Sequence, residues 1–203
     1  MKIGRLLLRL VVGGLFVGHG TQKLFGWFGG QGLDATAQGF DQLGLRPGRR
    51  NAIAAGVAEA GGGALLAAGL ETPLAASVLT ATMLTAIRRV HAKKGPWLSN
   101  GGYEYNVVLI AAALALAEAG PGRPSLDAAR GRERCGPGWA LAALGAGALG
   151  AIAANAAATR AAEAVPPARG DQPAAASTTA SRPTEAPARA EAQVQRASQG
   201  SAA

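Results

Sequence analysis

The first apolar stretch of the chain, GRLLLRLVVGGLFVGHGTQ at residues 4–22, decides the fold class. As an α-helix it would be roughly 28 Å long, which is just enough to cross a hydrocarbon core of about 30 Å. The stretch ends without a small-residue cleavage site of the kind that follows a secretory signal. We therefore expect a retained first membrane helix.

Three more apolar runs of similar length follow, at about 51–70, 73–90 and 103–119. The charged residues are concentrated between these runs and make up only 16% of the chain, whereas soluble domains usually carry near a quarter. This pattern predicts an all-α integral membrane protein, a multi-pass four-helix bundle occupying residues 1–128.

The remainder of the chain differs in composition. Residues 129–138 form a polar linker, and residues 139–158 form an Ala- and Gly-rich apolar run with few leucines. We expect that run to be a fifth transmembrane helix; a loosely associated surface helix is the alternative. Residues 159–203 are rich in Pro, Ala, Ser, Arg and Gln, a composition that predicts a disordered tail.

The positive charge of the chain is placed for a membrane. A net charge of +8 in a soluble protein would suggest nucleic acid, but Lys and Arg here flank apolar runs, where they meet lipid headgroups. We expect lipids as partners and no nucleic acid. The basic residues around the first and third loops, at 46–50 and 88–94, favour an N-terminus outside the cell. The basic residues at the N-terminus, at 2–9, and those at 123–134 favour the reverse. The aromatic residues expected at the interface are Trp27, Phe28, Trp97, Tyr103 and Tyr105.

Antiparallel threading of the four helices brings the polar residues into one half of the bilayer. Glu59 would lie roughly 12 Å along its helix, at a depth where a lone charge is costly. Gly56, Gly62 and Gly63 surround it in the sequence, and small residues typically line helix–helix contacts. The expected polar pocket in this half consists of His19, Lys23, Glu59, Arg88, His91, Glu104 and Asn106.

Five of these residues also have a purely structural interpretation. Glu59 and His19 can serve helix packing, Lys23 and Arg88 can reach the headgroups, and Glu104 suits a helix N-terminus. The two histidines lack a metal-ligand spacing, and Cys135 has no partner for an intrachain disulfide. We expect no metal site and no intrinsic redox centre, and the pattern identifies no catalytic residue.

Several motifs together resemble the DoxX family of bacterial membrane proteins. They are GHGTQKLFGWFGG at 18–30, AEAGG at 58–62, His91, GGYEYN at 101–106, GPG at 120–122 and SLD at 125–127. The resemblance covers about residues 3–128 and does not extend beyond Gly131.

The resemblance implies a four-helix protein of the bacterial inner membrane. DoxX-like proteins are linked to membrane redox systems, including a thiosulfate:quinone oxidoreductase and complexes that handle thiol and oxidative stress. By this resemblance the chain would be a redox accessory or subunit whose pocket takes a quinone-like molecule, with an oxidoreductase subunit as partner. A non-catalytic scaffold and, less favoured, a small transporter are the alternatives, and homo-oligomerisation stays open.

Overall fold

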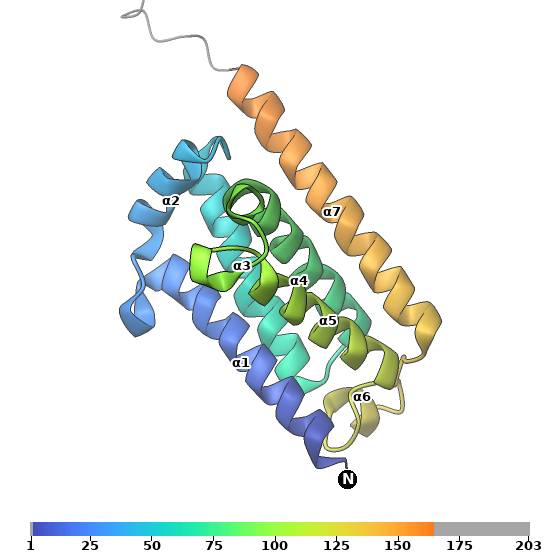
Figure 1. Cartoon of the computed structure of the whole chain (residues 1–203). Helices are drawn as coiled ribbons and strands as arrows, with labels where there is room; N and C mark the ends of the chain where they lie inside the picture. Colours follow the sequence, from blue (N-terminus) through green and yellow to red (C-terminus); the bar gives the residue numbers. More distant parts are fainter. Residues whose placement is uncertain (1, 165–203) are drawn as a thin grey trace, which may run out of the picture. The chain divides into compact units, whose positions relative to one another are not determined.

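The computed structural model describes residues 2–164, and every regular element in that range is helical. Of the tail expected at residues 159–203, the part from residue 165 onward lies outside the described residues. Short 3-10 and π turns connect the α-helices (Figure 1), whose bounds are α1 Ile3–Phe25, α2 Gly32–Gln42, α3 Gly48–Ala68, α4 Thr72–Ala86, α5 Glu104–Ala119, α6 Leu126–Ala129 and α7 Pro137–Glu163.

Helices α1 and α3 are antiparallel and pack backbone against backbone, because glycines line their contact. A Cβ atom added to Gly20 would lie 2.4 Å from the Ala60 backbone nitrogen, and one added to Gly13 would lie 2.6 Å from the Gly63 carbonyl oxygen. Such close approach is the usual means by which small residues join helices in lipid. This contact fixes the depth of His19 and Lys23 relative to Glu59.

The interior is apolar and so is much of the outer surface. Phe16, Leu66, Leu79 and Leu116 are fully buried between the helices. Long side chains on α1, α5 and α7 point outward with large exposed fractions, among them Val11, Val108, Leu141 and Ile152. An exposed apolar surface of this extent indicates a lipid environment.

Three helices are long and apolar enough to cross a membrane: Ile3–Phe25, Gly48–Ala68 and Pro137–Ala161. Helices α4 and α5 are shorter, with 15 and 16 residues, although a π-helical segment, Ile87–His91, continues α4. The chain is thus an all-α membrane protein in which α1, α3, α4 and α5 form the expected bundle and α7 is an additional apolar helix.

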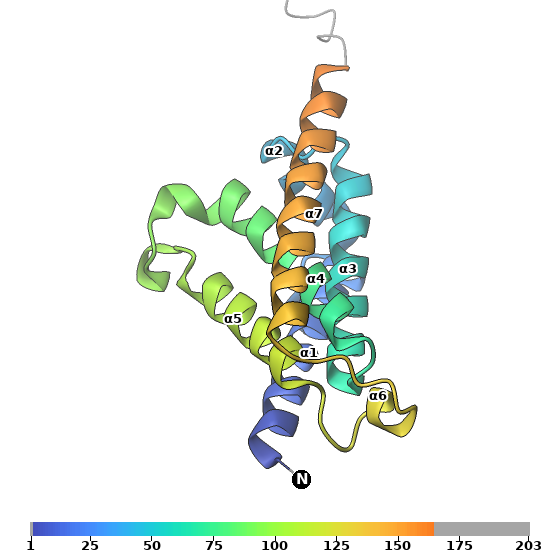
Figure 2. The same ribbon diagram turned by 90° about the vertical axis from the view of Figure 1, so that its right-hand side faces the viewer.

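Helix α7 runs parallel to α4 and packs along it (Figures 1 and 2). A Cβ atom added to Gly147 would lie 2.7 Å from the Thr80 Cβ atom, and Ala143 and Ala151 are buried. Its mean hydropathy of 1.6 is the highest of the three long helices, because alanine is apolar even where leucine is sparse. The helix extends to Glu163, five residues past the expected end at 158 and into the expected tail.

Two arginines hold the end of the bundle where the chain begins. Arg9, although buried, donates hydrogen bonds from Nη1 to the Pro121 carbonyl oxygen at 2.8 Å and from Nη2 to that of Pro124 at 2.5 Å. Arg5 donates to the carbonyl oxygen of Ala119, at the C-terminus of α5. A guanidinium is well suited to these carbonyls because a helix C-terminus is electronegative.

Asp127 joins the same end to the start of α4. Its carboxylate accepts hydrogen bonds from the backbone nitrogens of Glu71 and Thr72, at 3.1 and 3.4 Å, while its own nitrogen donates to the Gly69 carbonyl at 2.9 Å. The residue is buried and acts as an N-cap supplied from a distant part of the chain.

Candidate functional site

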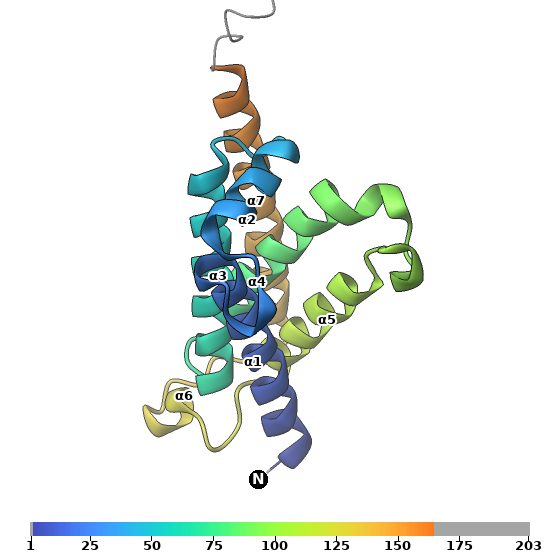
Figure 3. The same ribbon diagram turned by 90° about the vertical axis from the view of Figure 1, so that its left-hand side faces the viewer.

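A cavity of about 560 Å³ lies between the helices, at the end of the bundle that carries α2. The α4–α5 hairpin diverges from α1, α3 and α7 toward its tip (Figures 2 and 3), and residues on both sides of this divergence line the cavity. Alanines and other apolar side chains form most of the wall. Five of the seven residues expected in the polar pocket also line it: His19, Lys23, Glu59, His91 and Asn106.

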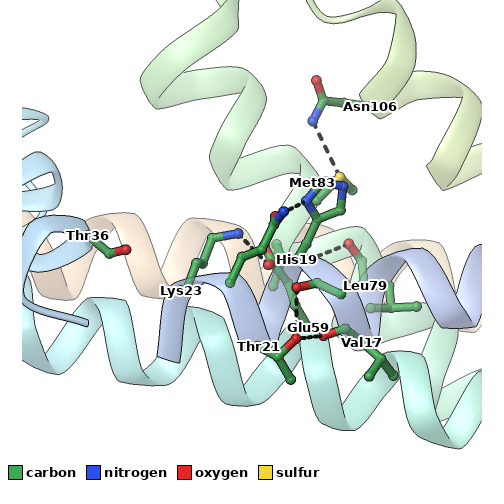
Figure 4. A network of polar contacts seen from close by, with 12 residues as sticks. Val17, His19, Thr21, Lys23, Thr36, Glu59, Leu79, Met83 and Asn106 are labelled. Atoms are coloured by element: carbon green, nitrogen blue, oxygen red, sulfur yellow. Dashed lines mark hydrogen bonds and ion pairs between the residues drawn. The ribbon is translucent and has the colours of Figure 1, made fainter. Parts of the chain in front are cut away.

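Lys23 and Glu59 form an ion pair on the wall of the cavity (Figure 4). The Lys23 Nζ atom lies 2.5 Å from Glu59 Oε2, and the side chains are 26% and 7% exposed. Glu59 lies on the glycine-lined face of α3, so its side chain points at α1 rather than at lipid. Pairing offsets part of the desolvation cost of each charge, which would be several kcal/mol for an unpaired ion at this depth.

The two histidines face the cavity from opposite sides. His19 Nδ1 lies 3.2 Å from Gln22 Oε1. His91 Nδ1 lies 2.7 Å from the Gly101 carbonyl oxygen. A carbonyl can only accept, so His91 Nδ1 carries a proton and its Nε2 remains for another partner. The Gln22 amide oxygen is an acceptor too, so the same holds for His19. In the neutral ring Nε2 is an acceptor, so each histidine can accept a hydrogen bond from a molecule in the cavity.

Asn106 is buried on α5, and its Nδ2 atom donates to Met83 Sδ at 3.3 Å (Figure 4). A thioether is a weak acceptor, so this amide retains hydrogen-bonding capacity. Tyr105, its neighbour, was expected at the membrane interface but lines the cavity and is 38% exposed.

The other two expected pocket residues do not line the cavity. Arg88 is exposed, and the Glu104 Oε1 atom accepts a hydrogen bond from the Leu98 backbone nitrogen at 2.8 Å. Arg89 lines the cavity in place of Arg88. The reason is the π-helical segment Ile87–His91, which has more residues per turn than an α-helix and therefore turns Arg89 toward the cavity in place of Arg88.

Arg89 belongs to a polar network that was not predicted from the sequence. Its Nε atom donates to Asn155 Oδ1 at 2.6 Å and its Nη2 atom to the Asn155 carbonyl at 3.3 Å. Asn155 is buried in α7. The only signal for it was one polar residue within the run AIAANAAAT at 151–159.

The remaining expected aromatics have varied positions. Trp27, Phe28 and Trp97 are well exposed, with fractions of 57%, 76% and 64%, and Tyr103 is half-buried. Among the described residues, no group of three His, Cys, Asp or Glu side chains is placed to hold a metal ion.

The fold and the cavity define a class: an all-α membrane protein with a mostly apolar cavity between its helices and several polar side chains on the cavity wall. The DoxX family model matches residues 4–92. A relative in Bacillus subtilis (strain 168), named "Putative oxidoreductase CatD", is 35% identical over 115 residues, which cover 57% of this chain and 79% of that protein. The chain belongs to the DoxX family, and the prediction from its motifs is confirmed. No solved structure matches it.

Proposed function

We propose that this chain is a multi-pass protein of the bacterial inner membrane that serves a redox system as an accessory or subunit. Its cavity would bind a quinone-like molecule near the α2 end. In this proposal residues 1–128 are the functional domain, 129–138 a linker, 139–158 the core of a fifth membrane span and 159–203 a tail.

The observation that carries the proposal is the combination of an apolar cavity with polar groups on its wall. Its volume of about 560 Å³ falls in the range of roughly 300–1,000 Å³ usual for small-molecule sites. A quinone ring is apolar with hydrogen-bond acceptors at its edge. The alanine-rich wall suits the ring, and the Lys23 ammonium and the Asn106 amide are suitable donors to the oxygens.

The relative's name supports a redox role without identifying a substrate. The residues that line the cavity would bind and orient the molecule. The Lys23–Glu59 pair would transfer a proton between the ammonium and the carboxylate, which lie 2.5 Å apart. An oxidoreductase partner would exchange electrons with the bound molecule. Catalytic residues are not assigned.

The test is a ligand-induced thermal shift on the full chain in detergent, with ubiquinone and menaquinone analogues of short tail. A ligand at about a hundred times its Kd stabilises a protein by roughly 2.7 kcal/mol. We expect a quinone to raise the Tm of the wild type, and to do so far less in His19→Ala and in the double variant Lys23→Met/Glu59→Gln. Arg88→Gln, outside the cavity, is the matched control. A wild type that no quinone stabilises would refute a quinone ligand.

A second candidate is a non-catalytic scaffold, and one observation favours it. The Lys23–Glu59 pair joins α1 to α3, so it also has a structural use. Under this alternative the variants would melt earlier or assemble poorly, and no small molecule would shift any of them.

A further inference from the structure

The wall of the cavity carries a positive charge that no described acidic side chain balances. Lys23 is paired with Glu59. Arg89 has neutral partners: Nε and Nη2 donate to Asn155, and Nη1 lies 3.5 Å from the Leu43 carbonyl oxygen. No carboxylate among the described side chains forms an ion pair with it.

The remaining groups on the cavity wall do not change this sign. The charged and titratable residues that line it are His19, Lys23, Glu59, Arg89, His91 and Tyr105. Glu59 is the one carboxylic acid among them and already forms an ion pair with Lys23. Protonation of either histidine would add to the positive charge, so the cavity favours an anion.

The Arg89 guanidinium is also fixed by hydrogen bonds within the protein rather than extended into solvent. A guanidinium has five N–H donors, and the three contacts to Asn155 and Leu43 use three of them. Asn155 is itself fixed, because its Nδ2 atom donates to the Ala151 carbonyl at 2.8 Å and lies 3.4 Å from Thr85 Oγ1. The amide oxygen is thereby directed at Arg89. Two N–H groups of Arg89 remain for a ligand.

We propose that the cavity selects an amphiphilic acid, with an apolar body and an anionic head that Arg89 binds, and that Asn155 of α7 is the positioning residue for Arg89. The proposal rests on the proposed small-molecule pocket and adds the charge of its ligand. It also gives α7 a role, although this helix lies outside the residues 4–92 that the family model matches. Ala154, the neighbour of Asn155, completes the wall.

The chemistry of the head follows from the donor. A guanidinium binds carboxylate, phosphate or an ionised enol oxygen through charge-assisted hydrogen bonds, which are roughly twice as strong as neutral ones. Such a head is carried by a free aromatic or fatty acid and by an anionic phospholipid alike. The free acid and the phospholipid offer the same anionic head, and competition by added anionic lipid distinguishes them.

The experiment measures the Kd of three probes for the full chain in phosphatidylcholine nanodiscs. The probes are 1,4-naphthoquinone, which is neutral, and 2-hydroxy-1,4-naphthoquinone and 2-naphthoate, which are anions at neutral pH. The variants are Asn155→Asp, which places a carboxylate against Arg89, and Arg89→Gln. Arg88→Gln, one residue away and exposed, is the control.

We expect the wild type and Arg88→Gln to bind each anion roughly tenfold more tightly than the neutral quinone, as one charge-assisted bond would give. Asn155→Asp and Arg89→Gln should remove the preference while leaving the affinity for 1,4-naphthoquinone nearly unchanged. A helix-packing role for Asn155 would change all three affinities together. Should Asn155→Asp fail to fold, Arg89→Gln still tests whether the cavity prefers the anionic probes.

The other outcomes separate this proposal from the proposed function. Equal affinity of the wild type for neutral and anionic probes overturns the anion selection and leaves the quinone pocket standing. Binding of 2-naphthoate alone, lost in Asn155→Asp, supports the anion selection and overturns a quinone ligand. No binding of any probe overturns both. If added phosphatidylglycerol competes with the probes, the natural anionic head belongs to a lipid. If it does not compete, the head belongs to a free acid.

Discussion

The Nζ atom of Lys23 and the Oε2 atom of Glu59 lie 2.5 Å apart and join α1 to α3 on the wall of the cavity. Glu59 is 5% exposed, so its charge depends on this one cation. The pair exists because glycines let the two helix backbones approach closely.

Glu59→Gln is expected to destabilise the protein by about 3 kcal/mol, because it leaves the Lys23 ammonium without a counter-charge in a mostly buried position. The double variant Lys23→Met/Glu59→Gln removes both charges and should recover most of the loss. Unfolding followed by circular dichroism in detergent measures both. If the double variant is less stable than Glu59→Gln, the loss in the single variant does not come from an unpaired Lys23 charge. Glu133→Gln, exposed beyond the bundle, is the control.

Gly20→Ala is expected to destabilise the α1–α3 contact by about 1–3 kcal/mol, the usual effect of overpacking. The added Cβ atom would lie 2.4 Å from a backbone nitrogen of α3, which cannot move aside as a flexible side chain would. Gly18→Ala is the matched control, since no atom lies within 4 Å of its added Cβ. Equal melting temperatures for the two variants would contradict the close packing described here.

Asp127→Ala is expected to cost about 0.5–2 kcal/mol, the usual effect of losing an N-cap, because the backbone nitrogens of Glu71 and Thr72 lose their acceptor. Asp127→Asn keeps a side-chain oxygen and should cost less. Hydrogen exchange of the first turn of α4 measures the effect locally. Unchanged protection there in Asp127→Ala would exclude the capping role.

Cys135 allows a direct test of orientation. It is exposed and lies at the end of the bundle where α1 begins, the end that the charge of the basic loops would place outside the cell. A membrane-impermeant maleimide should label it in intact spheroplasts.

The matched variant for this test is Cys135→Ser/Ser99→Cys, which moves the thiol to the opposite end, in the turn Leu98–Asn100. It should be labelled only after permeabilisation. The reverse pattern would place the N-terminus inside, in agreement with the basic residues before and within α1.

The sequence by itself determined the membrane class, the helices and the family. These depend on the lengths of apolar runs and on local motifs, and both are readable along one chain. Antiparallel threading also implied that His19, Lys23, Glu59, His91 and Asn106 share one half of the bilayer, because helix length fixes depth. In the structure all five line one cavity.

Only the tertiary structure decided which residues face each other. The π-helical segment turns Arg89 rather than Arg88 toward the cavity, and a change of helix type leaves no periodic signal in a short basic stretch. The contact of Arg89 with Asn155 depends on how α7 is registered against α4, which is set by the fit of small side chains such as Gly147 at Thr80. Register between helices is a property of their packed surfaces, and a pattern within one helix does not contain it.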